Sequence, residues 1–153
     1  LYTSSLKLDN KVFQRFISIF LYTIPLKAAF PFGYYLFTQF SFLKLFAYIT
    51  IPIALIENSL PFGGLLLFLI VFAGFVKNPK VPYFVRFNAC QALLLDIALI
   101  IFYYLFRIFP ITQFSPILFI VILSVFIFSS IQCLYGVEPE IPLISKSARM
   151  QIF

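Results

Sequence analysis

The chain has 153 residues, of which 63% are hydrophobic and 21% aromatic, while only 10% are charged. A soluble domain of this length is about half apolar and about a quarter charged, so these charges are too few to cover a surface in water. Lys and Arg outnumber the acids by eleven to five, for a net charge of +6. The composition excludes an ordinary soluble domain and predicts an integral membrane protein, with lipid covering part of its surface.

The chain is predicted to begin with a polar N-terminal segment, residues 1–15, followed by a first membrane span at about 16–40. Lys27 is the only charged residue in this span. Pro25 and Pro31 interrupt it, and proline removes a backbone hydrogen bond from a helix interior. We therefore expect the first span to be kinked or broken.

Two shorter apolar segments come next. The stretch at about 42–57 has an apolar part of about 12 residues, which covers about 18 Å as a helix and falls short of a hydrocarbon core of about 30 Å. We interpret it as an interfacial or re-entrant helix. The stretch at about 60–76 has no charge, carries Pro61 in its first turn and ends before Lys77. It is predicted to be the second span.

The remaining spans are predicted at about 82–106 and 116–135, and a polar C-terminal tail occupies 137–153. Together, residues 16–136 form the transmembrane domain. The predicted fold class is an all-α polytopic membrane protein with four transmembrane helices and a short interfacial or re-entrant helix.

The cations predict the orientation of the bundle. With four spans, the two termini and the turn between spans two and three share one side. That side carries Lys7, Lys11, Arg15, Lys77, Lys80, Arg86, Lys146 and Arg149. The other side has only Lys44 and Arg107. Because positive loops face the cytoplasm-equivalent compartment, both termini are expected there, and a three-span or five-span chain would divide the cations evenly.

The third span carries charged groups inside the membrane. Arg86 lies one turn inside its basic end, where a long side chain can reach back to the headgroups. Asp96 lies ten residues further along the chain, about 15 Å deeper and near the bilayer midplane. A carboxylate at that depth is costly and indicates a polar contact or a functional site. Two interpretations remain open, a structural hydrogen bond and a polar pathway, and Lys27 is a candidate partner at similar depth.

Two amides accompany these charges. Asn88 and Gln91 are three residues apart and therefore share one face of the helix. Gln132 of the last span lies at comparable depth. The group is expected either to form hydrogen bonds between helices, each worth about 1 kcal/mol, or to line a narrow polar groove.

The sequence offers little support for catalysis or cofactor binding. It contains no His, which is the commonest metal ligand and the usual acid or base at neutral pH. Cys90 and Cys133 lie inside hydrophobic segments and are interpreted as reduced, buried thiols. The cations flank apolar stretches, so they indicate membrane orientation and not nucleic-acid binding. We expect no enzymatic activity, no metal and no cofactor.

The third span also matches a known pattern, namely an aromatic residue, Val-Arg-Phe-Asn, two residues, Gln-Ala, a short aliphatic run and Asp. In this chain the pattern is Phe84, Val85–Asn88, Gln91–Ala92, Leu93–Leu95 and Asp96. Two further elements agree, a Tyr-x-x-Pro sequence at Tyr22–Pro25 and a basic turn at Val76–Asn78. These residues resemble the twenty-kilodalton subunit family of the chloroplast inner-envelope protein translocon (TIC complex), which includes plastid-encoded and cyanobacterial members.

The resemblance implies a four-helix protein of the inner envelope of the plastid, with both termini in the stroma. It implies a channel-forming or core subunit that helps to move preproteins across that membrane. Its partners would be other translocon subunits, the preprotein in transit and lipids. Arg86, Asn88, Gln91 and Asp96 would then shape the polar interior of the membrane domain and hold the bundle together.

Two alternatives stay open. The many Phe and Tyr residues suit a structural or assembly subunit of a photosynthetic membrane complex, although the chain has no His to bind chlorophyll. The charges inside the membrane and the interrupted first span suit a small-solute transporter, although no inverted repeat is visible.

Overall fold

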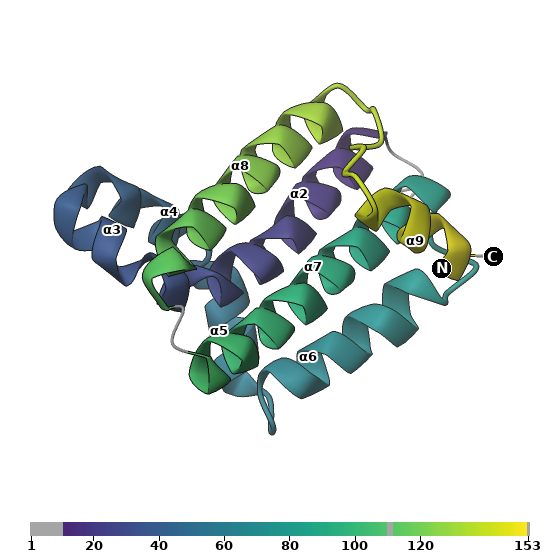
Figure 1. Ribbon diagram of the computed structural model, residues 1–153. Coiled ribbons are helices and arrows are strands. Elements are labelled where there is room, and N and C mark those ends of the chain that lie inside the picture. Colours follow the sequence, from purple (N-terminus) through teal and green to yellow (C-terminus); the bar gives the residue numbers. More distant parts are fainter. Residues whose placement is uncertain (1–10, 110–111, 153) are drawn as a thin grey trace.

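The computed structural model describes residues 11–109 and 112–152, and the regular structure in this part of the chain is helical throughout (Figure 1). The elements are α2 (Lys11–Ala28), η1 (Phe30–Gly33), α3 (Tyr34–Gln39), η2 (Ser41–Lys44), α4 (Leu45–Ile49), α5 (Ile51–Ser59), α6 (Gly64–Val71), the π-helical turn η3 (Phe72–Val76), α7 (Tyr83–Ile108), η4 (Thr112–Phe114), α8 (Ser115–Leu134) and α9 (Ile144–Gln151). The predicted all-α fold class is confirmed. Most of the predicted polar N-terminal segment, including Lys7 and Asp9, lies outside the described residues.

Four helices lie side by side in the order α8, α2, α7 and α6 (Figure 1). The central helix α2 packs against both α7 and α8, and α7 packs against η3 on its other side. Helix α5 contacts α2 from behind this layer, while α3 and α4 extend beyond its end. Helix α2, the first of the described helices, therefore joins the two halves of the bundle.

Length and composition allow α7 and α8 to cross a membrane individually. Two bent helix pairs also pass the same test. In the first pair, α2 is followed by η1 and α3 at an angle of 57°. In the second pair, η2 and α4 are followed by α5 at an angle of 54°. The structure therefore has between two and four candidate spans in its described residues. The predicted break in the first span is present. It falls just before Pro31, while α2 continues through Pro25 to Ala28.

The predicted second span forms a shorter helix than its charge-free run suggests. Residues 60–63 form a turn in which Phe62 and Gly63 both have positive φ, so that α6 begins only at Gly64. The eight residues of α6 and the five of η3 extend about 20 Å, less than a hydrocarbon core of about 30 Å. The span boundaries at 60–76 and 42–57 therefore stay predictions.

Aromatic rings fill the end of the bundle at which α2 gives way to η1. The Phe119 ring of α8 is fully buried, and its centroid lies 5.2 Å from that of Phe37 and 6.3 Å from that of Phe30. Gly33 of η1 lies directly against Phe119, because a Cβ built on the glycine would come within 2.7 Å of the ring. The absence of a side chain at residue 33 is what allows η1 to pack on α8.

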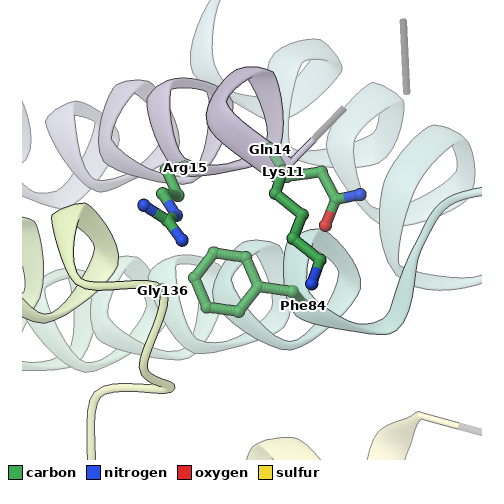
Figure 2. Close-up of a pocket in the computed structure, with 5 residues that line it drawn as sticks. All are labelled: Lys11, Gln14, Arg15, Phe84 and Gly136. Atoms are coloured by element: carbon green, nitrogen blue, oxygen red, sulfur yellow. The ribbon is translucent and has the colours of Figure 1, made fainter. Parts of the chain in front are cut away.

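The opposite end of the bundle brings together segments that are far apart in the sequence. Arg15 Nη1 of α2 donates to the carbonyl of Leu134, 3.1 Å away at the end of α8. Lys77 Nζ, just after η3, donates to the carbonyl of Gln151 in α9, 2.8 Å away. The start of α2 and the end of α9 thus share one basic end, where Arg15 also lines an open hollow (Figure 2).

Candidate functional site

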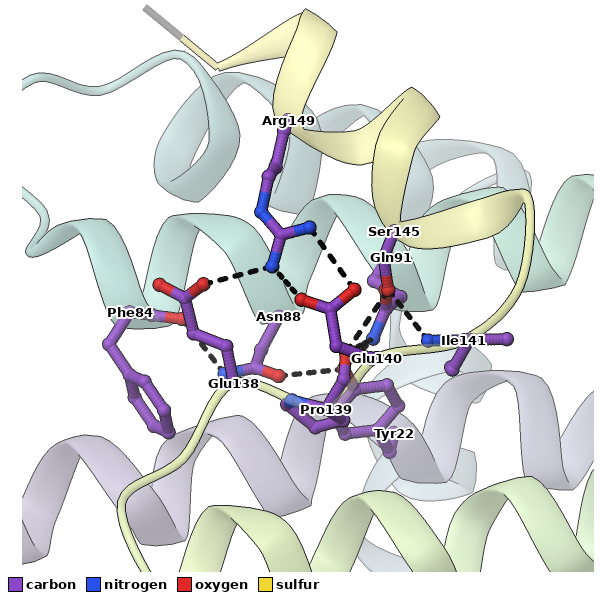
Figure 3. A network of polar contacts seen from close by, with 10 residues as sticks. All are labelled: Tyr22, Phe84, Asn88, Gln91, Glu138, Pro139, Glu140, Ile141, Ser145 and Arg149. Atoms are coloured by element: carbon purple, nitrogen blue, oxygen red, sulfur yellow. Dashed lines mark hydrogen bonds and ion pairs between the residues drawn. The ribbon is translucent and has the colours of Figure 1, made fainter.

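A polar network is buried between α2 and α7. Asn88 and Gln91 have no exposed surface, and Tyr22 is 1% exposed. The Tyr22 hydroxyl donates to Asn88 Oδ1 at 2.6 Å and accepts from Gln91 Nε2 at 2.8 Å (Figure 3). Both amides face the neighbouring helix because they are three residues apart. The structure therefore brings together the two amides that the sequence places on one helix face.

Asn88 is also held by two further groups. Its Nδ2 donates to the carbonyl of Phe84, one turn earlier in α7, at 2.8 Å. The buried Cys133 Sγ of α8 lies 3.7 Å from Asn88 Oδ1, which makes it a weak donor to the same oxygen. The last helix thus meets the network through Cys133, whereas the neighbouring Gln132 is only partly buried.

The C-terminal tail closes the network on its third side. Gln91 Nε2 donates to the carbonyl of Pro139, 3.2 Å away, and the Ser145 hydroxyl donates to Gln91 Oε1. Ser145 Oγ in turn accepts from the backbone N–H of Ile141 at 2.7 Å. Pro139 and Ser145 are both buried. The segment predicted to be a polar tail therefore crosses α7 as an extended chain and enters a helix, α9.

Charges on the outer surface hold this tail in place. The Arg149 guanidinium bonds to the carboxylates of Glu138 and Glu140 (Figure 3). It also lies 4.8 Å from the centroid of the Phe87 ring. The guanidinium hydrogen bond to Glu140 lowers the pKa of that exposed carboxyl below its usual range. The contribution of this pair is thus fully present at neutral pH and is lost as the pH falls through the lowered pKa of Glu140.

Arg86 joins α7 to the end of η3. Its side chain is buried, with 9% exposure for the residue, and Nε donates to the carbonyl of Val76 at 3.1 Å. That carbonyl is at the end of η3, where helical carbonyls lack partners. The guanidinium thus satisfies this helix end and holds α7 to η3, while the expected reach of Arg86 to the headgroups stays a prediction.

Lys27 and Asp96 belong to a second cluster, deeper along α2 and α7. Lys27 forms an ion pair with Glu57 of α5, and their side chains are 33% and 21% exposed. Asp96 is half-buried and close enough to interact electrostatically with both. The proposed pairing of Lys27 with Asp96 is therefore corrected. The position of α5 behind α2, which hydropathy does not reveal, places the Glu57 carboxylate closer.

Replacing both members of this ion pair is expected to be less harmful than replacing either one. Glu57→Leu or Lys27→Met alone leaves a partly buried charge without its partner and should cost about 1–3 kcal/mol. Lys27→Met combined with Glu57→Leu should cost less than either single change. The measurement is the free energy of unfolding in detergent micelles, with Asp96→Asn as the matched variant.

Purely additive effects would show that Lys27 and Glu57 do not act as a pair. A cost for Asp96→Asn as large as that for Glu57→Leu would restore Asp96 as the main partner of Lys27.

The sequence did not predict that Ser145 and the Pro139 carbonyl belong to the network. It identified Tyr22 only as part of a motif and not as a partner of Asn88. Tyr22 stands out as a hydroxyl-bearing residue in an apolar helix and marks the Tyr-x-x-Pro element, but nothing local shows that it faces Asn88. Ser145 and the Pro139 carbonyl carry no sequence signal at all. Their role depends on the tail folding back over α7.

Comparison with known proteins adds an independent finding. Residues 4–148 match the profile of a family described as "Chloroplast import apparatus Tic20-like". The chain is similar to a Tic20 family protein of Synechocystis, at 33% identity over 91% of this chain and 92% of the relative. It is 29% identical to Protein TIC 20-v, chloroplastic, of Arabidopsis thaliana, over 91% of this chain and 71% of the relative. It is also 29% identical to the Tic20 family protein Ycf60 of Porphyra purpurea, over 90% and 75% of the two chains.

Proposed function

The chain belongs to the Tic20-like family of the chloroplast import apparatus, and from this premise we propose that it is a core, channel-forming membrane subunit of a preprotein translocon. Its role is to help move preproteins across the inner envelope membrane of a plastid. No catalytic step is part of this proposal. Energy for transport would come from other components of the complex.

One observation carries the proposal, namely the division of the polar residues into a closed network and an open cluster. Tyr22, Asn88 and Gln91 satisfy one another inside the bundle and are covered by the tail. Lys27 and Glu57 keep part of their surface exposed behind the layer of helices. The closed network supports a rigid scaffold, and the open cluster supports a polar face inside the membrane.

The layer of α8, α2, α7 and α6 is covered in part by α5 and α9, and the rest of its surface is available to other subunits. Most exposed side chains of α7 and α8 are large and apolar, among them Ile100 and Ile120, with exposures of 49% and 50%. Four helices enclose too little space for a polypeptide, so a conduit would be completed by partner subunits or further copies of the chain. We therefore place the Lys27, Glu57 and Asp96 cluster on the side that faces the preprotein and its partners.

The basic end of the bundle supports the proposed orientation. Arg15, Lys77 and Arg149 lie at the same end as the start of α2 and the end of α9. By the positive-inside rule this end would face the stroma. Both termini would then lie in the stroma.

Co-isolation and import measurements test this function. A tag placed before residue 11 avoids α9, which is bonded to Lys77 through Gln151. The tagged protein is expected to co-purify with import components, and its depletion should slow import of a radiolabelled preprotein into isolated organelles, with recovery on re-expression. Unchanged import after depletion, or co-purification with pigment-binding subunits in place of import components, would overturn the proposal.

A further inference from the structure

The hollow at the basic end of the bundle lies between the first turns of α2 and α7 and the end of α8. It encloses about 240 Å³ and is lined by Lys11, Gln14, Arg15, Phe84 and Gly136 (Figure 2). A water molecule occupies about 30 Å³ in the liquid, so this space accepts a group much larger than one water. Lys11 and Arg15 are four residues apart and therefore lie on the same face of α2.

The cations in the hollow are held in place by the backbone around them. Arg15 Nη1 donates to the carbonyl of Leu134, which uses one of the five N–H donors of the guanidinium. Gly136 has φ +74°, and a Cβ there would lie 2.8 Å from Arg15 Nη2. The glycine therefore gives the chain its turn after α8 and makes room for the guanidinium. Figure 2 shows the Lys11 ammonium and the Arg15 guanidinium on either side of the Phe84 ring.

These cations have no carboxylate partner among the described acids. Glu57 bonds to Lys27, and Glu138 and Glu140 bond to Arg149. The remaining described acid, Asp96, belongs to the cluster around Lys27. The hollow thus places two positive charges together, and lysine and arginine are common ligands of the oxygens of a phosphate group.

Three of the residues that line the hollow each have an exposed aromatic side chain beside them in the sequence. These side chains are Phe16 beside Arg15, Tyr83 beside Phe84 and Tyr135 beside Gly136, with exposures of 60%, 45% and 76%. Aromatic side chains gather at the headgroup level of a membrane protein. We therefore expect the hollow to lie at the headgroup level of the membrane.

We propose that this hollow binds the phosphate of an anionic phospholipid headgroup, with Lys11 and Arg15 as its cationic ligands. Basic pockets between membrane helices on the positive side of a bilayer recognise headgroups in this way. A bound lipid would join the start of α2 to α7 and to the end of α8. The inference concerns lipid recognition and does not depend on the proposed role in protein transport.

The test is lipid binding to the purified full chain in detergent micelles, followed by native mass spectrometry. Phosphatidylglycerol is the anionic probe and phosphatidylcholine the zwitterionic control. Lys11→Gln should weaken phosphatidylglycerol binding about fivefold, since a cation near an anionic membrane surface contributes about 1 kcal/mol. Lys80→Gln removes the same charge at the same end, from an exposed turn outside the hollow. It should change binding less than twofold.

Lys11 is exposed, so Lys11→Gln should leave the fold intact. Adding Arg15→Gln should increase the loss to about 30-fold. Equal weakening by Lys11→Gln and Lys80→Gln would mean that only the diffuse surface charge attracts lipid, and would overturn the site. Equal binding of both lipids would also overturn it. Displacement of phosphatidylglycerol by millimolar inorganic phosphate would assign the hollow to a free anion instead of a lipid.

Discussion

Replacing Asn88 with leucine is expected to destabilise the bundle by about 2 kcal/mol, because it leaves the Tyr22 hydroxyl without its acceptor in a dry interior. Leucine has the branched shape of asparagine but a larger volume, so overpacking of this buried site adds to the loss of hydrogen bonds. Tyr22 donates to Asn88 Oδ1 at 2.6 Å, and both residues are almost fully buried. Water cannot replace the lost acceptor without entering the contact between α2 and α7.

The matched variant for this prediction is Tyr22→Phe, which removes the hydroxyl itself. The variant carrying both Asn88→Leu and Tyr22→Phe should be more stable than the sum of the single effects indicates, by about 1 kcal/mol. The measurement is the free energy of unfolding of each variant in detergent micelles. Additive effects within about 0.3 kcal/mol would contradict a direct bond between Tyr22 and Asn88.

Replacing Gly33 with alanine is expected to destabilise the bundle by about 1–3 kcal/mol through overpacking. The added methyl group would lie 2.7 Å from the Phe119 ring, and the rings of Phe30 and Phe37 limit any movement of Phe119. Gly33 itself has φ −104°, so the cost arises from the contact and not from the backbone.

Gly74→Ala is the matched control for Gly33→Ala. No atom lies within 4 Å of the position that its Cβ would take, and alanine has a higher helix propensity than glycine. The melting temperature of Gly74→Ala should therefore be unchanged or slightly raised. Adding Phe119→Leu to Gly33→Ala should recover part of the lost stability. Equal melting temperatures for Gly33→Ala and Gly74→Ala would contradict the close packing of η1 on α8.

Local sequence patterns predict those features of the fold that depend on single segments. Long apolar runs locate α7 and α8, and prolines locate the break after α2. Helical spacing also places Asn88 and Gln91 on one face. Each of these inferences uses residues within one or two helical turns, where backbone geometry alone decides which side chains are neighbours.

The partners of these residues depend on how separate helices pack. Lys27 pairs with Glu57 because α5 folds back against α2, and Gln91 bonds to Ser145 because the tail crosses α7. Helical periodicity cannot predict either contact, because Lys27 and Glu57 are 30 residues apart and Gln91 and Ser145 are 54 residues apart. The partner of Arg86 is equally hard to predict from the sequence, because its acceptor is a backbone carbonyl at the end of η3.

The central claim is that the cluster of Lys27, Glu57 and Asp96 faces a preprotein in transit. A photoreactive residue at position 96 should leave the ion pair of Lys27 and Glu57 in place. The control position is residue 120, which is half-exposed on α8, outside the three helices that carry the cluster. With a preprotein arrested during import, the account predicts crosslinks to it from position 96 and none from position 120. Crosslinks from neither position, or equally from both, would contradict the account.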